Sequence, residues 1–371
     1  MTSSSPDVLD RRALNRALLA RQWLLADAAP PGATALDAIE HLAGLQAQDV
    51  KAPYYQLWAR LPGFDPEELS ALLAERAAVR MAVMRGTLHL VSARDAAPLR
   101  ALTQPVIERA TEGNWAVPEH VDRAALAAAG RALVEAQPRT FAQLGALLSE
   151  RWPDADPKAL AQQIRALVPL VQVPPRGLWG RSGAAAHTSL EQWLGQAGEE
   201  APIDAHVLRY LAAFGPARPQ DFQKWSGRPD AAEAFARLRP ELVSFSGEDG
   251  RELLDLPGAP RPPGDTPVPP RLTGPFDNLV LSHADTSRVV PPDHKPLVMT
   301  QNGLFPGLVL IDGFVAGNWR IKATKKLATL TIASFSGQAY NKTDQAALAR
   351  EGRRLLAFAA PGAAALEVTF G

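Results

Sequence analysis

Apolar residues near the N-terminus recur at helical spacing and then give way to short runs typical of strands. Positions three and four residues apart predict helices over about 14–23, 38–45 and 65–76. Two apolar runs follow, at 79–84 and 88–92, and they flank the turn residues Arg85-Gly86-Thr87. This part of the chain therefore predicts helices followed by a β-hairpin.

The same order of elements recurs twice. In the second stretch, helices are predicted at 122–136, 140–152 and 157–167, and a small wing at 171–173 and 178–180. In the third, helices are predicted at 206–214, 219–225 and 230–238, and a hairpin at 242–245 and 253–256. Three helical groups that each close in a hairpin predict tandem winged helix-turn-helix motifs. An ordinary α+β protein with incidental hairpins is the alternative that periodicity leaves open.

A proline-rich segment separates these groups from a β-rich C-terminal part. Residues 257–270 hold seven prolines, a composition that favours extended backbone and excludes a helix. Beyond it the expected strands form a small barrel or curved sheet, with a late helix. Their predicted positions are 279–281, 297–299, 308–311, 314–316, 317–321, 327–333 and 365–370 for strands and 344–360 for the helix.

The expected fold class is therefore α+β, with three tandem winged helix-turn-helix motifs followed by a C-terminal β-barrel-like domain. The expected domains are winged-helix unit 1 (1–118), unit 2 (119–200), unit 3 (201–256), a proline-rich linker (257–270) and the C-terminal domain (271–371). A chain of 371 residues is long enough for several such units, each with a core of its own.

Composition excludes several classes of protein. There is no cysteine, which excludes disulfides, thiol nucleophiles and cysteine-ligated metals. The seven histidines fall in no metal-binding motif, so neither a metal nor a cofactor is expected. The 39 basic residues balance the 39 acidic ones, so any nucleic-acid surface must come from local clustering. No apolar run approaches the roughly 18 residues needed to span a bilayer, and a cytoplasmic protein with no membrane partner is expected.

The segment Gln46-Ala47-Gln48 holds two amides that could converge only outside a helix. Residues i and i+2 lie about 200° apart on an α-helix, so these side chains cannot meet while the helix continues. Pro53 disfavours helical backbone at Ala52. The interpretation is a helix C-terminus across 46–48, where both amides can reach one cleft. On residue types alone, an exposed polar helix end is the simpler alternative.

Several segments resemble the winged-helix DNA glycosylases of the AlkZ and YcaQ type, over nearly the whole chain. The segments that carry the resemblance are Leu45-Gln46-Ala47-Gln48-Asp49, Ala52-Pro53-Tyr54, Leu57-Trp58-Ala59-Arg60, Met84 to Val91, Phe276-Asp277-Asn278-Leu279, Ser282-His283-Ala284-Asp285, Arg288-Val289 and Asp312 to Arg320. The resemblance implies three winged-helix motifs with a C-terminal β-barrel, and excision of N-alkylated purines, in some members from interstrand crosslinks. It also implies that Gln46 and Gln48 form a catalytic Gln-apolar-Gln signature of the AlkZ-like branch.

Glutamine chemistry limits the reaction. An amide has no titratable proton near neutrality, so it can orient a water or stabilise charge but cannot act as a general acid or base. This suffices when the leaving base already carries positive charge, as N7- and N3-alkylpurines do. The expected activity is a monofunctional DNA glycosylase acting as a monomer on double-stranded DNA with alkylated purines. Its role would be DNA repair or self-resistance to a DNA-alkylating natural product such as an azinomycin.

Other residues are candidates for DNA contact, each with a structural alternative. Arg85 and Thr87 at the turn suit phosphate, whereas His89 on a strand is more often a satisfied structural residue. The aromatic side chains after the glutamines could stack on a base or pack in the core, and the sequence favours neither interpretation. Arg320 and Lys322 could place a C-terminal face on the phosphate backbone, or protect an edge strand. The full set is Lys51, Tyr54, Tyr55, Trp58, Arg85, Thr87, His89, Asn278, His283, Arg320 and Lys322.

A non-catalytic winged-helix transcriptional regulator is the competing function. Helix-turn-helix architecture alone would favour it. The Gln-apolar-Gln segment lies outside a recognition-helix position, and a regulator has no need of a C-terminal barrel. These two features favour the enzyme.

Overall fold

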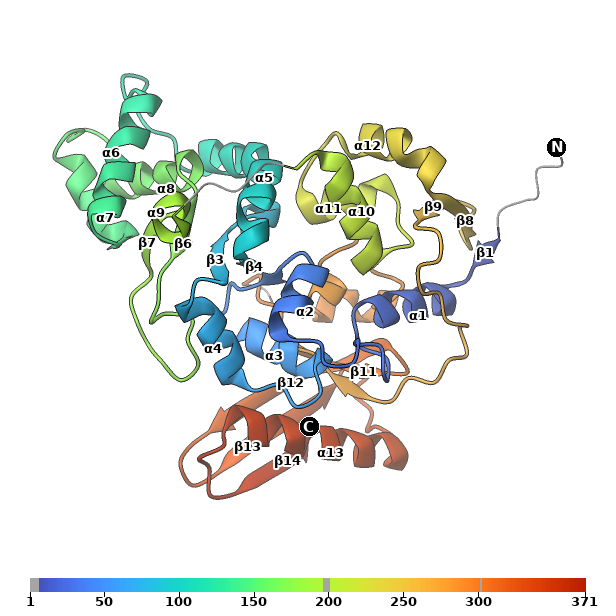
Figure 1. Cartoon of the computed structure of the whole chain (residues 1–371). Helices are drawn as coiled ribbons and strands as arrows, with labels where there is room; N and C mark the ends of the chain where they lie inside the picture. The colour runs from blue at the N-terminus through green and yellow to red at the C-terminus, as the bar shows by residue number, and fades with distance from the viewer. Residues whose placement is uncertain (1–6, 196–200, 301) are drawn as a thin grey trace.

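The computed structural model describes residues 7–195, 201–300 and 302–371 (Figure 1). The first helices (blue) lie at the centre of the view, the second helical group (green) at the upper left and the third (yellow-green) at the upper right. The C-terminal sheet and its helix (red) lie below them. None of the described helices combines the length and apolar character needed to cross a membrane.

One six-stranded sheet joins the first two helical groups. Its strand order is β2-β4-β3-β6-β7-β5. The bounds are β2 Leu45–Gln46, β3 Ala78–Ala82, β4 Leu88–Ser92, β5 Arg139–Thr140, β6 Leu170–Gln172 and β7 Ala186–Ser189. The hairpin β3–β4 pairs with the second group through Arg80 opposite Gln172 and Met81 opposite Val171. The shared sheet thus places the ends of β2, β3 and β6 in one region.

Four of the five described helices of the first group begin at side-chain caps. Asp10 and Asp65 accept hydrogen bonds from backbone N–H groups of the helices they precede, and Thr34 forms a capping box with Asp37. Pro53 stands in the first turn of its helix, where its missing N–H costs nothing. The helices are α1 Arg11–Arg21, α2 Ala35–His41, α3 Ala52–Arg60, α4 Pro66–Ala74 and the long α5 Ala93–Asn114.

The second group has a hydrophobic core of its own. Its elements are α6 Arg123–Ala136, α7 Phe141–Ser149, α8 Pro157–Leu167 and α9 Leu190–Leu194. Leu126, Leu144 and Leu160 are buried together in this core. Gly130 lets α6 and α8 pack closely, because a Cβ there would lie 2.2 Å from Ile164. The group is therefore a separate helical unit that the sheet ties to the first one.

The third group is held by aromatic packing. Its elements are α10 Ile203–Phe214, α11 Pro219–Ser226, α12 Ala231–Leu238, β8 Val243–Gly247 and β9 Glu252–Asp255, with β1 (Val8–Leu9) parallel to β8. Tyr210 stacks on Phe214 at 5.1 Å between ring centroids and meets Phe222 edge to face at 5.5 Å. Such aromatic pairs add stability beyond the area they bury.

The C-terminal sheet is open, a half-barrel and not a closed one. Its order is β10-β11-β12-β13-β14, with antiparallel pairs up to β13 and a parallel pair between β13 and β14. The bounds are β10 Arg271–Leu272, β11 Gly307–Ile311, β12 Phe314–Ala323, β13 Ala328–Ser334 and β14 Leu366–Phe370, with α13 at Lys342–Ala359. The architecture is a mixed α+β fold, and the number of winged-helix motifs stays a prediction.

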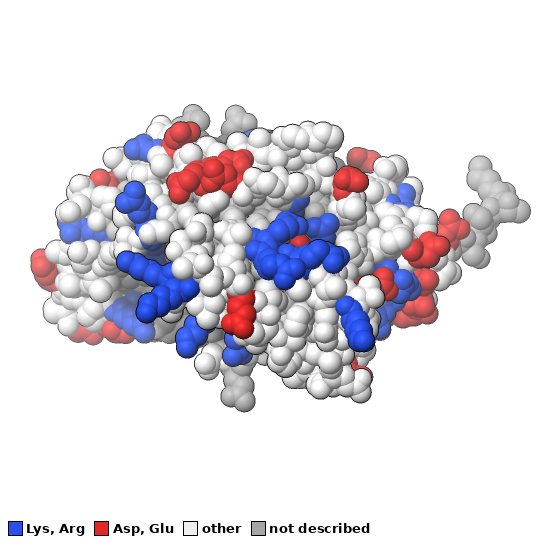
Figure 2. All heavy atoms as spheres, turned by 90° about the horizontal axis from the view of Figure 1, so that it is seen from below, with Lys and Arg blue, Asp and Glu red and all other residues white. Residues whose placement is uncertain are grey.

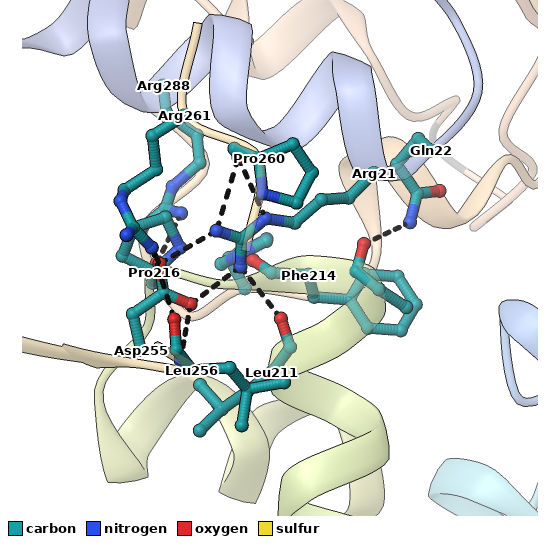
Figure 3. Close-up of polar contacts among 12 residues, drawn as sticks. Arg21, Gln22, Leu211, Phe214, Pro216, Asp255, Leu256, Pro260, Arg261 and Arg288 are labelled. Atoms are coloured by element: carbon teal, nitrogen blue, oxygen red, sulfur yellow. Dashed lines mark hydrogen bonds and ion pairs between the residues drawn. The ribbon is translucent and has the colours of Figure 1, made fainter. Parts of the chain in front are cut away.

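Buried ion pairs connect the groups. Arg21 of α1 donates to both carboxylate oxygens of Asp255 on β9 at 2.7 Å and to Leu211 O of α10 at 2.8 Å (Figure 3). Arg60 of α3 holds Asp277 in the same two-pronged way. Because both partners in each pair are buried, removing one would cost about 3–5 kcal/mol of stability. The first, third and C-terminal groups are thereby fixed to one another.

Three short predicted strands are wrong. The partner of β6 is β7, and 178–180 is a turn in which Gly177 and Gly180 have positive φ. Residues 278–280 form the short 3-10 helix η3, because Asp277, held by Arg60, accepts a hydrogen bond from Leu279 N. The run 297–299 begins with the last residue of another 3-10 helix, η4 (Pro292–Leu297), and continues as a bend. Periodicity alone cannot tell whether a short apolar run is a strand or a turn.

The proline-rich segment 257–270 contains no helix or strand, as predicted. It is held in place by hydrogen bonds from Arg16 to Thr266 O and from Arg21 to Pro260 O.

Candidate active site

The segment Gln46-Ala47-Gln48 continues a strand, and the predicted helix C-terminus at this segment is wrong. Helix α2 ends at His41, and the chain reverses through Ala43 and Gly44, which have positive φ. Gly44 is required there because a Cβ would lie 2.9 Å from Val91. Gln46 then pairs with His89, and Ala47 N donates to Leu88 O at 2.8 Å. Gln46 is the last residue of strand β2 and Gln48 follows it in a bend, so the two amides stand at the end of a strand and not at a helix end.

Gln46 is buried and fixed from two directions. Gln46 is only 6% exposed, and its side-chain Oε1 accepts a hydrogen bond from Arg85 Nη2 at 2.7 Å. Its backbone oxygen accepts from Gln56 Nε2 at 3.1 Å. A carbonyl oxygen has two lone pairs, so Gln46 Oε1 can accept one further donor.

Arg85 occupies the 3-10 turn η1 (Met84–Gly86) between β3 and β4, with a φ of 58°. Besides Gln46, it donates to Trp225 O of α11 at 3.0 Å. The next residue, Gly86, accepts a hydrogen bond through its carbonyl from Arg165 Nη2 of α8 at 2.5 Å. Burial lowers the pKa of Arg85 to about 10, which still leaves the guanidinium charged at neutral pH. Arg85 therefore binds groups of the protein, and Thr87 Oγ1 likewise donates to Met84 O.

His89 is a buried, neutral histidine beside this pair. Its Nδ1 donates to Thr87 O at 3.0 Å, and its Nε2 lies 3.4 Å from Arg85 Nη2. Burial and the nearby Arg85 charge lower the pKa of His89 to about 3. A neutral imidazole is too weak an acid to protonate a leaving group at neutral pH. This is the structural role that the sequence left open for it.

Gln48, unlike the buried Gln46, lies at the protein surface. It is exposed, and its Oε1 accepts a hydrogen bond from Leu88 N at 3.1 Å. It stands at the edge of a cavity of about 280 Å³ between the first and second groups. We call this cavity the groove. Its polar lining consists of Gln48, Arg80, Arg165, Gln172, Arg176 and His187.

The groove is positively charged. Arg80 donates to Ala47 O at 2.8 Å, which ties the base of the groove to the glutamine segment. Burial, together with Arg176, lowers the pKa of Arg80 to about 10, and burial lowers the pKa of His187 to about 4. His187 stacks on Phe141 at 4.4 Å between ring centroids. Among the described residues that line the groove, none is Asp or Glu.

The remaining DNA-contact candidates divide into buried and exposed residues. The aromatic side chains Tyr54, Tyr55 and Trp58 are buried, and Tyr54 Oη donates to Gly177 O at 2.7 Å, so their packing matches the core alternative. Asn278 and His283 are also buried and bonded, to Gly44 O and Phe214 O respectively.

Lys51, Arg320 and Lys322 are exposed. Figure 2 shows the face at the bottom of Figure 1, where groups of Lys and Arg side chains stand among acidic ones. DNA contact by any of these candidates stays a prediction.

A model of the DNA glycosylase AlkZ-like family matches residues 39–358. This chain belongs to that family. It is 25% identical over 315 residues to the interstrand DNA cross-link repair glycosylase of Streptomyces sahachiroi, covering 78% of this chain and 82% of that protein. The solved structure of Streptomyces sahachiroi DNA glycosylase AlkZ matches 97% of this chain and 99% of its own, with a TM-score of 0.76 and 21% identity. An AlkZ-like DNA glycosylase hydrolyses N-glycosyl bonds, so this protein is an enzyme that acts on DNA.

Sequence analysis of this AlkZ-like chain did not identify the basic residues of the groove. Arg80 lies within a strand, Arg165 within a helix and Arg176 in a loop, far apart in sequence. The pairing of β3 with β6 and the hydrogen bond from Arg165 to Gly86 O bring these segments together. The one available signal was Arg176 beside two prolines and a glycine in the predicted wing, and on its own it indicates only a turn.

Proposed function

We propose that this AlkZ-like glycosylase releases cationic N7- or N3-alkylated purines from double-stranded DNA, with Gln46 and Gln48 orienting the attacking water. The observation that carries the proposal is the absence of a proton donor where one would be needed. The described lining of the groove holds no carboxylic acid, and the pKa values of His89 and His187 are lowered to about 3 and about 4. A neutral base would have no acid to protonate it as it leaves.

A cationic base avoids this requirement. Positive charge on an N7- or N3-alkylated purine already weakens the N-glycosidic bond, so the sugar can become oxocarbenium-like without protonation of the base. Amide oxygens can then hold a water close to C1′ and stabilise the developing positive charge. The base leaves with the bonding electrons, and the water oxygen bonds to C1′ and loses a proton to solvent. The products are a free base and an abasic site.

The two glutamines have different roles in this proposal. Gln46 is buried, and Arg85 fixes its Oε1, so it supplies a rigid acceptor with one lone pair free. Gln48 is exposed and its Oε1 already accepts from Leu88 N, which leaves its amide at the edge of the groove to meet the lesion and the water. A fixed acceptor beside an accessible one suits the positioning of a single water.

Bulky and crosslinked adducts belong to the proposed substrate range. Gln48 lies on the surface, so a reaction centre there does not require the lesion to fit an enclosed pocket. The relative from Streptomyces sahachiroi is named an interstrand DNA cross-link repair glycosylase. We also propose that the enzyme acts as a monomer.

The test is base release from defined duplexes. Purified protein is incubated with DNA carrying one N7-methylguanine or one N7-linked interstrand crosslink, and alkali then cleaves the strand at abasic sites. Cleavage that requires Gln48 is the expected result. A non-catalytic regulator would bind DNA and leave both lesions intact. The ratio of the two rates separates an enzyme specialised for crosslinks, as in self-resistance, from a broad alkylpurine repair enzyme.

A further inference from the structure

The groove holds three arginines, of which Arg80 is buried and Arg165 and Arg176 are half-buried. Elsewhere in the chain, the buried Arg16, Arg21 and Arg60 pair with carboxylates, and the buried Arg100 and Arg288 donate to backbone carbonyl oxygens. Arg80, Arg165 and Arg176 form no ion pair with any of the described residues 7–195, 201–300 and 302–371. Buried charge without a counter-charge lowers stability. An anion in the groove would give the buried Arg80 a counter-charge and would also meet the two half-buried guanidinium groups that line the groove.

Several donors in the groove also lack a hydrogen-bond partner. Arg80 is only 2% exposed, yet its Nε and Nη1 are buried and unbonded, and so is Nε of Arg176. Gly177 brings the loop that carries Arg176 against Arg80, since a Cβ at 177 would lie 2.9 Å from Arg80 Nη1. Unsatisfied buried donors are uncommon in folded proteins and mark places where a ligand or water is bound.

The buried acceptors of the groove are fewer and lie on other residues. Gln172 Oε1 and His187 Nδ1 have no partner among the described residues. Amide orientation can be reversed, so Gln172 can present its Nε2 as a further donor. The volume of about 280 Å³ is several times the roughly 30 Å³ share of one water, so an anion fits together with water that bonds His187.

We propose that the groove binds one backbone phosphate of the DNA strand that carries the lesion, with Arg80 at its base and Arg165 and Arg176 at its sides. Planar guanidinium groups match phosphate oxygens in geometry as well as charge. The inference rests on the proposed function, because it places the phosphate next to Gln48. The shared chemistry would also suit free inorganic phosphate.

Charge balance favours a phosphate over the lesion base as the occupant. The proposed lesion base is a cation while it is attached to the sugar, and three unpaired guanidinium groups would repel it. A phosphate between them cancels part of this repulsion and fixes the strand at the same time. Backbone contacts of this kind set the register of a protein on DNA without reading its sequence.

Binding to an uncleavable duplex tests the site without chemistry. The duplex carries a tetrahydrofuran abasic analogue, and each flanking phosphate in turn is replaced by a neutral methylphosphonate. When the methylphosphonate replaces the phosphate that the groove binds, the native protein should bind that duplex about tenfold more weakly than the unmodified one, as expected for a lost charged hydrogen bond. The Arg176→Gln protein should bind more weakly overall and show no further loss at that position. Arg80→Gln, checked by thermal unfolding, provides a second variant.

Arg151→Gln is the matched control, since Arg151 is an exposed arginine of the same unit that stacks on Trp152 outside the groove. It should retain the full methylphosphonate effect. Equal effects at all phosphates, or an effect that persists in Arg176→Gln, would overturn the proposal. Inorganic phosphate that stabilises the native protein but not Arg176→Gln, without any positional effect on DNA, would show a free-anion site and also overturn it. A positional effect without release of N7-methylguanine would keep the phosphate site and remove the proposed substrate.

Discussion

Arg85 Nη2 lies 2.7 Å from Gln46 Oε1, and the same guanidinium donates to Trp225 O of the third helical group. The turn that carries Arg85 is fixed by the second group through Arg165 and Gly86. Gln46 is thus oriented by a residue whose own position depends on all three groups. In the proposed mechanism, this arrangement would supply a rigid acceptor to a reaction at the surface.

Replacing Arg85 should reduce the rate of base release more than DNA binding. Arg85→Lys retains a cation but cannot reach both Gln46 and Trp225, so Gln46 would lose its fixed orientation. We expect the single-turnover rate on N7-methylguanine DNA to fall about tenfold or more. Affinity for the abasic-analogue duplex should change less than threefold, about 0.7 kcal/mol. An equal loss in rate and affinity would show that Arg85 acts through DNA binding or folding and not by positioning.

Each glutamine should matter for the chemical step. Gln46→Ala and Gln48→Ala should lower the excision rate about thirty-fold or more, corresponding to about 2 kcal/mol of transition-state stabilisation. Gln48→Ala is the cleaner test because it removes one exposed hydrogen bond, whereas Gln46→Ala leaves Arg85 Nη2 without its acceptor. Gln220→Ala, an exposed glutamine on α11, controls for surface substitution. Parental rates in both alanine variants would remove the water-positioning role.

The sequence predicted elements with strong local signals and failed where distant contacts decide. Helix α8 was predicted with its Pro157 start and hairpin β8–β9 with its Glu-Asp-Gly turn, since caps and turn residues are local. Helix α5 was not predicted, because Pro98 and Pro105 within it suggest breaks that packing overrides. The glutamine segment was found, but its backbone was assigned to a helix end, because the pairing of β2 with β4 depends on residues more than forty positions away. The groove arginines are far apart in the sequence and come together only in the folded chain, so no local sequence pattern marks them as one site.

No covalent intermediate between protein and DNA should form. Lys51 is the amine closest in sequence to the glutamines, and it is exposed beyond them at the start of α3. Water suffices as the nucleophile when the base leaves as a neutral molecule, so a Schiff base is not needed. Borohydride added during turnover should trap nothing. A trapped adduct that disappears in Lys51→Ala would replace hydrolysis by a lyase mechanism.

Stability should fall as the pH drops below the ordinary histidine pKa of 6.5. Burial lowers the pKa of His206 to about 4 and that of His283 to about 3, with Arg288 also lowering the latter. Between these values and 6.5 the unfolded chain takes up protons that the folded chain does not bind, so the free energy of unfolding decreases with falling pH. Each such histidine contributes a slope of up to about 1.4 kcal/mol per pH unit.

Urea unfolding at pH 7.5 and pH 5.0 measures this slope. His206→Gln should make it shallower, because His206 is buried and its Nε2 has no hydrogen-bond partner among the described residues. Gln220→Ala, which changes an exposed residue that has no titratable group, should leave the slope as it is. The same slope in native protein and His206→Gln would contradict the assignment of His206 as a buried neutral group.

The range of excised bases should follow charge on the base. N7-methylguanine and N3-methyladenine are cationic in DNA and should be released, whereas uracil, hypoxanthine and 8-oxoguanine need a proton that the site cannot give. The histidines beside the glutamines have pKa values lowered to about 3 and about 4, so both are neutral, and the amides have no acidic proton at all.

Single-turnover rates over pH 6–9 on duplexes that differ only in the lesion decide the matter. The rates for cationic lesions should change little over this range, because neither His89 nor His187 changes its protonation state there. Gln48→Ala should lower all of these rates in parallel. Efficient release of uracil, with a rate that rises as the pH falls, would reveal an acid outside the groove, and the roles given to Gln46 and Gln48 would then have to be abandoned.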